Sequence, residues 1–321
     1  MKNQKSRKWN DKMKSGKGFL IAFCLIIALS LSLMPATCAG EGVSDASWPR
    51  TIDDDLQNQV TLDANPERIV SLSPSNTEVL FALGLSDRIV GVTDYCTYPE
   101  EALEKSKVGG FSTVSIEKVI ALKPDFIVAS PGNNLEVVDR LSTLGIPVYY
   151  VEAEDLDQIY TTFEKLGYLT GTEDKATEII SDLKAREETV QKEGEALTKK
   201  PVVAHVIWND PIYVSGKGTF QDELIRIAGG ENAFADKEGH AIVNIEEFVH
   251  INPDILMINS GSGMGSDDAD ILEYFKTEPR LSALSAIASD KIIRVDSDKA
   301  DRAGPRLWDL LEEIAPKIRE M

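Results

Sequence analysis

Several aromatic and polar side chains follow directly after runs of β-branched residues, where a strand would end. They are Tyr95, Trp208, Asp298 and Arg302. Because ligands collect at the carboxyl ends of strands in open α/β sheets, these side chains are predicted to face a common cleft. Each aromatic ring taken alone more often packs than binds, whereas the set on one edge favours a large, flat, partly apolar ligand.

The residues that catalysis or a metal centre needs do not converge in the sequence. The three histidines, His205, His240 and His250, lack the spacing of a zinc cluster. Neither a phosphate-cradling glycine loop nor a nucleophile elbow is present, and Cys96 has no histidine near it in the sequence. We therefore expect no enzyme activity, no metal site and no resident cofactor.

The charge of the chain excludes nucleic acid as a partner. The 321 residues carry a net charge of −19, and the acidic excess lies beyond a basic N-terminus. Such a surface repels phosphate backbones, and no basic stripe interrupts it. With 42% hydrophobic residues, the chain is able to bury one large core or two smaller ones.

The N-terminus has the pattern of an export signal. A lysine-rich start precedes the apolar run Phe19–Met34, which Pro35 and small residues follow. This pattern predicts a signal peptide or an uncleaved anchor at 1–39. Cys38 is a candidate for lipid modification, although the residues before it match the usual pattern poorly. The protein is therefore expected to be exported, and to be periplasmic or attached to the cell surface.

Beyond this segment, β-branched runs alternate with helical patterns, which predicts α/β lobes with mostly parallel sheets. The predicted strands cover 68–72, 89–92, 126–129, 148–151, 202–207, 255–258 and 292–295. The expected organisation is a polar linker at 40–60, an N-terminal lobe at 61–171, an inter-lobe helix at 172–198 and a C-terminal lobe at 199–321.

The predicted inter-lobe helix is unusually long. One apolar stripe runs through Thr172–Leu197, with Thr172 as the expected N-cap and two acidic residues in the first turn. At 1.5 Å per residue this helix would extend about 39 Å. A helix of that length is a stiff tether that limits the motion of the two lobes.

An internal repeat supports the two-lobed interpretation. Residues 115–128 match residues 244–257 at a constant offset of 129, and each copy predicts a capped short helix, a Pro-Asp turn and a buried strand. Glu117 and Glu246 occupy equivalent places in the first helical turn, where the helix dipole favours negative charge. Pro-Asp before a strand is also common α/β punctuation, but the shared Ile, Glu, Pro and Asp favour two lobes of like construction.

These motifs carry a family resemblance that runs from about residue 68 to the C-terminus. The chain resembles the cobalamin-binding periplasmic proteins of ABC importers, a group that also includes carriers of ferric siderophores and haem. The segments that carry the resemblance are 69–78, 91–99, 115–125, 215–232 and 302–306. It implies two Rossmann-like lobes joined by one long helix, the class III periplasmic binding protein architecture, with little hinge closure.

The resemblance also implies roles for particular residues. The positions that match corrinoid contacts are Tyr95, Phe111, Tyr213, Asp298 and Arg302. Phe111 and His240 each stand where the family pattern has a tryptophan, so His240 either meets the ligand edge or is a solvent-facing histidine in the loop 239–243. Glu117 and Glu246 are implied to meet the permease.

The resulting hypothesis is a non-catalytic carrier that delivers a corrinoid to an ABC permease and its ATPase subunits. The rival ligand is a ferric siderophore or haem. Haem would need an axial ligand, for which Tyr95, Tyr213 and His240 are the candidates. A chelatase-like enzyme is the alternative of another class, since that chemistry also occupies a bilobal fold; the export signal argues against it.

Overall fold

Two large sheets, each flanked by helices, and a two-stranded hairpin form the part of the chain that the computed structural model describes, residues 47–260 and 271–321. The architecture is α/β, as predicted, and Ser47–Met321 is one compact unit. The predicted signal or anchor at 1–39, including Cys38, lies outside the described residues. The predicted lobe boundaries stay a prediction.

The N-terminal sheet is parallel throughout, with the strand order β5-β4-β3-β6-β7. Its strands are β3 (Ile69–Ser71), β4 (Ile89–Val92), β5 (Ser106–Lys107), β6 (Phe126–Ala129) and β7 (Val148–Tyr150). Its helices are α2 (Pro74–Ala82), α3 (Ile116–Ala121), α4 (Leu135–Thr143) and α5 (Leu156–Thr170), with short 3₁₀ turns η1 (Ser86–Arg88) and η2 (Glu100–Glu104). Strands β3 and β6 are buried at every position, as expected of a sheet covered on both faces.

The C-terminal sheet is mixed, with the order β11-β9-β8-β12-β13 and β10 beside β8. Its strands are β8 (Val202–Asn209), β9 (Ile212–Ser215), β10 (Glu231–Asn232), β11 (His240–Val243), β12 (Ile255–Ser260) and β13 (Ile292–Asp296). The helices are α7 (Phe220–Ile227), α8 (Ile245–Ile251), α9 (Ile271–Thr277), α10 (Ser285–Ala288), α11 (Ser297–Ala300) and α12 (Arg306–Glu320). The antiparallel strands β9 and β11 were not predicted.

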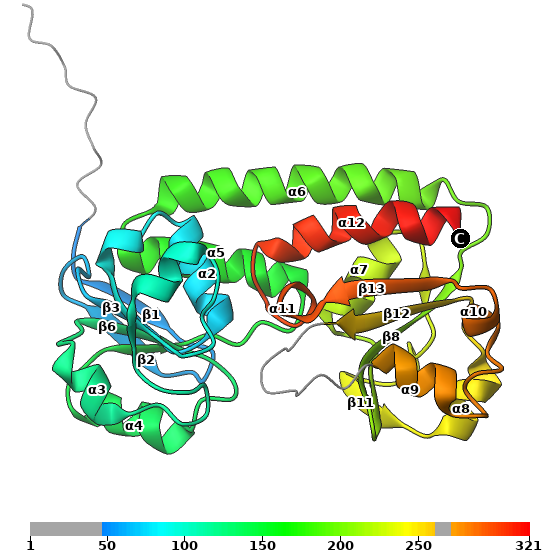
Figure 1. Ribbon diagram of the computed structural model, residues 1–321. Helices are drawn as coiled ribbons and strands as arrows, with labels where there is room; N and C mark the ends of the chain where they lie inside the picture. Colours follow the sequence, from blue (N-terminus) through cyan, green and yellow to red (C-terminus); the bar gives the residue numbers. More distant parts are fainter. Residues whose placement is uncertain (1–46, 261–270) are drawn as a thin grey trace, which may run out of the picture. The chain divides into compact units, whose positions relative to one another are not determined.

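Helix α6 (Glu173–Glu195) joins the two halves and runs along both sheets, with α12 beside it (Figure 1). Arg186 of α6 binds Asp309 and Glu312 of α12 at 2.7 and 2.8 Å, which fixes the helix along the C-terminal half. The prediction of one long helix is confirmed. Thr172 is the N-cap residue, but its hydroxyl pairs with that of Thr170 and makes no capping bond.

One apolar core passes from the N-terminal sheet to the C-terminal sheet without interruption. The same cluster contains Val79 of α2, Phe163 of α5, Leu183 of α6 and Trp308 of α12. Each of these side chains is at most 3% exposed. Relative motion of the two halves would expose apolar surface, which costs roughly 25 cal/mol for each Å².

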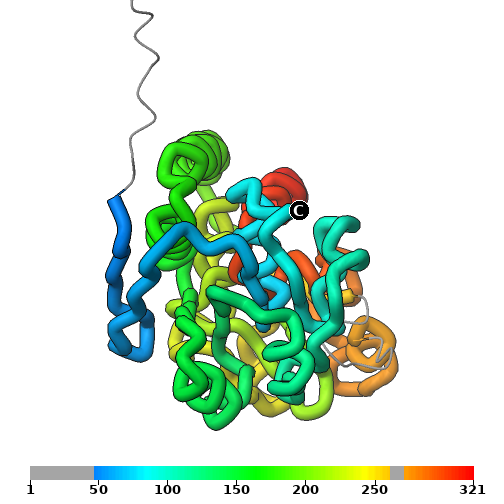
Figure 2. The backbone as a smooth tube through the Cα atoms, turned by 90° about the vertical axis from the view of Figure 1, so that its left-hand side faces the viewer, coloured from blue at the N-terminus to red at the C-terminus, as the bar shows by residue number. Residues whose placement is uncertain are grey.

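The polar linker expected at 40–60 is wrong where the structure describes it. Strands β1 (Arg50–Asp53) and β2 (Gln59–Leu62) form an antiparallel hairpin, which lies at the edge of the unit beside α5 (Figure 2). Arg50 anchors it: the side chain is buried, its guanidinium lies 4.7 Å from the ring centre of Trp48, and it pairs with Glu173. Tertiary contacts therefore order a segment whose own pattern is weak.

Candidate functional site

Tyr95 and Phe111 lie on neighbouring loops at the carboxyl edge of the N-terminal sheet. Tyr95 follows β4 and is 39% exposed. Its ring approaches Gly110, the residue before Phe111. The Phe111 ring packs against Gly132, which has φ +93° and where a Cβ would lie only 2.1 Å from the ring. Glycine at this position therefore makes room for the aromatic ring.

Trp208, Tyr213 and His240 come together on the C-terminal sheet. Trp208 pairs with Tyr213 across β8 and β9, and the rings of Tyr213 and His240 stack with centroids 6.3 Å apart. Trp208 lies inside β8 and not after it, because the strand runs two residues further than predicted. The indole N–H of Trp208 donates to the carbonyl of Asp210 at 3.1 Å.

His240 begins the edge strand β11 and does not lie in a loop, and the residue is exposed, so the alternative of a solvent-facing histidine is not excluded by its position. Its Nε2 donates to Oε1 of Gln221 at 3.2 Å, since an amide oxygen only accepts. The residue keeps an accessible face, but the protein packed around it lowers the pKa of the imidazole, with Glu154 opposing. His240 is therefore neutral at neutral pH.

Asp298 and Arg302 form an ion pair of 2.7 Å at α11. The guanidinium of Arg302 also contacts Oε1 of Glu78 at 3.2 Å and the carbonyl of Tyr95 at 3.3 Å. Arg302 is 7% exposed, and both terminal nitrogens of its guanidinium are bonded inside the protein, whereas its Nε is buried without a hydrogen-bond partner in the described part of the chain.

Helix α11 connects the predicted ligand residues of the two sheets. On one side Arg302 reaches Tyr95; on the other, Gln221 donates to the carbonyl of Ala300 at 2.9 Å and also contacts His240. The residues that these contacts connect are Tyr95, Tyr213, His240, Asp298 and Arg302. Phe111 and Trp208 adjoin this set through the loop at Gly110 and through strand pairing.

Glu117 and Glu246 lie apart from these contacts, in the first turns of α3 and α8. Both are exposed. The hydroxyl of Ser115 donates to Glu117 at 3.0 Å, and backbone and side-chain hydrogen bonds hold the pKa of this carboxyl below its usual value. Glu246 instead pairs with Arg280 at 2.7 Å.

Four further residues around the ligand set were not predicted as site residues. They are Glu78, Gln221, Ile242 and Arg306. Ile242 is 62% exposed and faces Tyr213 across the ladder of β9 and β11. Glu78 and Arg306 lie in recognisable motifs, but no spacing rule relates residues so far apart in the chain.

A buried polar chain runs behind the C-terminal aromatic residues. His205 is fully buried; its Nε2 donates to Asn259 at 2.9 Å, and its Nδ1 accepts from Ser215 at 2.8 Å. Asn259 donates to Asp301 at 2.7 Å. Burial lowers the pKa of His205 to about 4. Dense surrounding protein raises that of Asp301 to about 6, although part of this side chain is accessible.

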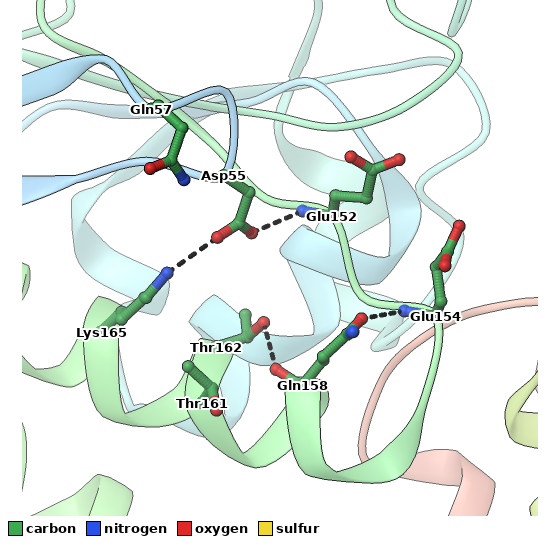
Figure 3. Close-up of a pocket in the computed structure, with 8 residues that line it drawn as sticks. All are labelled: Asp55, Gln57, Glu152, Glu154, Gln158, Thr161, Thr162 and Lys165. Atoms are coloured by element: carbon green, nitrogen blue, oxygen red, sulfur yellow. Dashed lines mark hydrogen bonds and ion pairs between the residues drawn. The ribbon is translucent and has the colours of Figure 1, made fainter. Parts of the chain in front are cut away.

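A separate polar pocket of about 500 Å³ lies between the β1–β2 hairpin and α5 (Figure 3). Its lining residues are Asp55, Gln57, Glu152, Glu154, Gln158, Thr161, Thr162 and Lys165. Asp55 pairs with Lys165 at 2.7 Å and accepts from the backbone of Glu152 at 2.8 Å. Since none of the predicted ligand residues lines it, we do not assign the ligand to this pocket. Among the described residues, no cluster of His, Cys, Asp or Glu is suited to hold a metal ion.

Comparison with known proteins decides the family. Residues 69–299 match the model of the periplasmic binding protein family. The chain belongs to this family. An uncharacterised ABC transporter substrate-binding lipoprotein of Bacillus subtilis is 35% identical to it over 280 residues, which span 84% of this chain and 86% of the relative.

Two further proteins are similar to this family member. A vitamin B12-binding protein of Salmonella typhimurium is 33% identical over 242 residues, or 75% of this chain and 85% of the relative. The crystal structure of a possible iron-binding periplasmic solute-binding protein from Staphylococcus epidermidis is 31% identical, with a TM-score of 0.70. It covers 79% of this chain and 99% of that one.

The protein is thus a substrate-binding component of an ABC importer and not an enzyme, which removes the chelatase alternative. Membership implies a permease with its ATPase as partners and a place of action outside the cytoplasm. The class III architecture is shared with the solved structures that resemble it. In the described parts of the chain, no helix is both long and apolar enough to cross a bilayer.

Proposed function

We propose that the chain captures a corrinoid between its two sheets and delivers it to the permease. The observation that carries this proposal is the gathering of aromatic side chains from both sheets around α11, with Tyr95 and Phe111 on one side and Tyr213 with His240 on the other. Rings placed in this way offer flat apolar surface to a macrocycle, and His240 among them keeps a hydrogen-bond partner in Gln221.

The acidic and basic groups near these rings support the same ligand. Arg302 is neutralised by Asp298 and Glu78, so a strongly anionic chelate gains little net charge attraction there. A bulky ligand held chiefly by aromatic contact fits such a site better. The resemblance to a vitamin B12-binding protein at 33% identity supports the same ligand class.

Haem or a ferric chelate is the second candidate, and two observations favour it. His240 is neutral at neutral pH, which is the state that binds iron, and its ring stacks with that of Tyr213. A possible iron-binding protein is also similar at 31% identity. Of the three axial candidates Tyr95, Tyr213 and His240, the histidine already uses Nε2 on Gln221, so only its other ring nitrogen would bind the metal.

The deciding experiment is a titration of the purified protein with cyanocobalamin, haemin and a ferric hydroxamate, followed by absorption spectroscopy and gel filtration. Co-elution of unchanged cyanocobalamin supports the corrinoid proposal. Exclusive binding of haemin, with loss of its spectral change in a His240→Ala variant, would transfer the assignment to haem. Binding of the hydroxamate alone would transfer it to siderophores.

Glu117 and Glu246 are the proposed docking residues for the permease. Both are exposed and both stand in the first turn of equivalent helices, α3 and α8. A permease built from two like subunits would present two like basic pockets, which matches one carboxylate on each half of the carrier. Such charge pairs mainly set the register and the encounter rate.

The N-terminal segment is proposed to direct export, either as a signal peptide that is removed or as an anchor that holds the protein at the membrane through a helix or through a lipid on Cys38. Its lysine-rich start and apolar run carry this proposal, and one relative is named a lipoprotein. Mass spectrometry of protein from the native host tests it. A soluble cytoplasmic form that retains residues 1–34 would overturn it.

A further inference from the structure

A buried carboxylate on α2 holds two arginines of the other half of the molecule. Glu78 accepts from Nε and Nη2 of Arg306 at 2.9 and 2.6 Å and from Nη1 of Arg302 at 3.2 Å. The side chain of Glu78 is 1% exposed, and those of the arginines are 7% and 11% exposed. Charges this deeply buried require close partners.

The two arginines in turn hold the loop that follows β4. Arg302 donates to the carbonyl of Tyr95 at 3.3 Å, and the Arg306 guanidinium lies 4.3 Å from the centre of the Tyr98 ring. Between them, the hydroxyl of Thr97 reaches Asp298 at 3.5 Å. The loop Tyr95–Tyr98 is therefore held at three of its residues. The contacts come from α11, from Arg302 just after it and from the start of α12.

The charges of this cluster balance. Glu78 and Asp298 oppose Arg302 and Arg306, and Arg306 also donates to the carbonyl of Asp298 at 3.0 Å. Burial disfavours the charge of Arg306, but hydrogen bonding to Glu78 and the nearby carboxylates raise its pKa overall. If Glu78 lost its charge, the two arginines would repel each other and the contacts with the loop would loosen.

We propose that Glu78 is a positioning residue for ligand binding: by orienting Arg302 and Arg306, it fixes the loop Tyr95–Tyr98 and with it the ring of Tyr95. The inference rests on the proposed function, in which Tyr95 contacts the ligand. It assigns Arg302 an indirect role, because the groups that the arginine contacts are Glu78, Asp298 and the Tyr95 carbonyl.

The molecule offers a matched control at the same junction. Glu223 of α7 accepts from the backbone N–H of Leu156, at the start of α5, at 2.8 Å. Like Glu78, it is a carboxylate that joins the two halves, but it touches neither the loop Tyr95–Tyr98 nor the arginines. Glu223→Gln therefore reports the effect of loosening the junction alone.

The test compares Glu78→Gln, Glu78→Asp and Glu223→Gln by hydrogen exchange and by calorimetry with cyanocobalamin. We expect Glu78→Gln to speed amide exchange at 94–98 selectively and to weaken cyanocobalamin binding about tenfold. Glu78→Asp should restore part of both, since it keeps the charge. Glu223→Gln should change exchange near residue 156 and leave the affinity unchanged.

Wild-type exchange at 94–98 in Glu78→Gln, or an equal effect in Glu223→Gln, would overturn the inference. If Glu78→Gln fails to fold, the charge-balanced double variant Glu78→Gln with Arg306→Met takes its place and should show the same selective exchange. The exchange readout needs no ligand. Selective exchange at 94–98 in a protein whose wild type binds no cyanocobalamin would therefore refute the corrinoid proposal and still support the positioning of this loop by Glu78.

Discussion

In both copies of the repeat, the aspartate of the Pro-Asp turn accepts hydrogen bonds from the backbone at or just before the start of a strand, which the sequences did not show directly. Asp125 accepts from the backbone N–H groups of Glu67 and Arg68 at 2.9 Å, just before β3. Asp254 accepts from the N–H of Val202, the first residue of β8, also at 2.9 Å. In both copies the Pro-Asp turn therefore connects the start of one strand to the neighbouring strand, so its aspartate has a structural role in each.

The same two copies differ in the chemistry of their side chains. Ser71 pairs with Val128 across β3 and β6, and His205 pairs with Met257 across β8 and β12, so the two residues occupy equivalent buried places. One is a hydroxyl that does not titrate, whereas the other is a histidine. The two glutamates proposed to dock differ too, since Glu246 has an arginine partner and Glu117 has a serine. The backbone plan is shared, and each half carries its own charges.

The largest expected effect is on stability at low pH. Of the two equivalent buried residues Ser71 and His205, only His205 in the C-terminal sheet takes up a proton. His205 has a native pKa of about 4 and an unfolded pKa of about 6.5, so the unfolded state binds more protons between these values. The resulting stability is present above pH 6.5 and is lost as the pH falls to 4, by about 3 kcal/mol.

Asp301 has the opposite effect on stability and offsets part of this loss at low pH. Its native pKa of about 6 lies above the unfolded value, so its contribution favours the native state at low pH and is lost as the pH rises to 6. Its accessible face screens the effect. The free energy of unfolding, measured with urea, should therefore fall more steeply below pH 6.5 in Asp301→Asn than in the double variant Asp301→Asn with His205→Gln. Parallel profiles of the two proteins would contradict this assignment.

The next effect tests whether both sheets supply aromatic surface to the ligand. Burying one ring against a corrin or porphyrin contributes roughly 1 to 3 kcal/mol, so Phe111→Ala should weaken binding by about one to two decades. Tyr213→Ala should weaken ligand binding by a similar factor. Leu135→Ala on α4, an exposed apolar residue outside the set, is the control. Unchanged calorimetric affinity in Phe111→Ala would remove that residue from the site.

A smaller effect is expected from the shared Pro-Asp turns. Removing a carboxylate acceptor from strand N–H groups typically costs about 1 to 2 kcal/mol. Asp125→Ala should lower the free energy of unfolding more than Asp254→Ala, because Asp125 accepts two hydrogen bonds and Asp254 accepts one. Denaturant unfolding measures both against Asp182→Ala, an exposed aspartate of α6. Equal stability of all three variants would show that these turns are not fastened by their aspartates.

The smallest free-energy effect is expected at the two glutamates proposed to dock on the permease. Surface charges of this kind contribute about 0.3 to 1 kcal/mol to the helix that carries them, so Glu117→Ala with Glu246→Ala should fold and bind ligand normally. Uptake by the reconstituted importer should slow, most clearly at low salt. Glu136→Ala, in the first turn of α4, is the matched control. Unimpaired uptake by the double variant would leave both glutamates as helix-end residues only.

The secondary structure of the parallel strands was largely predictable. The strands at 89–92 and 126–129 have the predicted bounds, and the long helix begins one residue later and ends three residues earlier than the predicted range 172–198. Short strands buried on both faces form continuous apolar runs, which the sequence displays directly. The antiparallel strands β9 and β11 were missed because each has only four residues, and runs that short give little periodic signal.

What the sequence determined by itself is therefore local: apolar periodicity, the repeat and the positions of aromatic residues after strands. What only the tertiary structure decided is which distant groups neutralise one another. Glu78 meets Arg302 across 224 residues and Arg306 across 228, and no local pattern encodes such a pairing. The physical reason is burial: folding removes these charges from water, and only the complete fold brings each of them a partner.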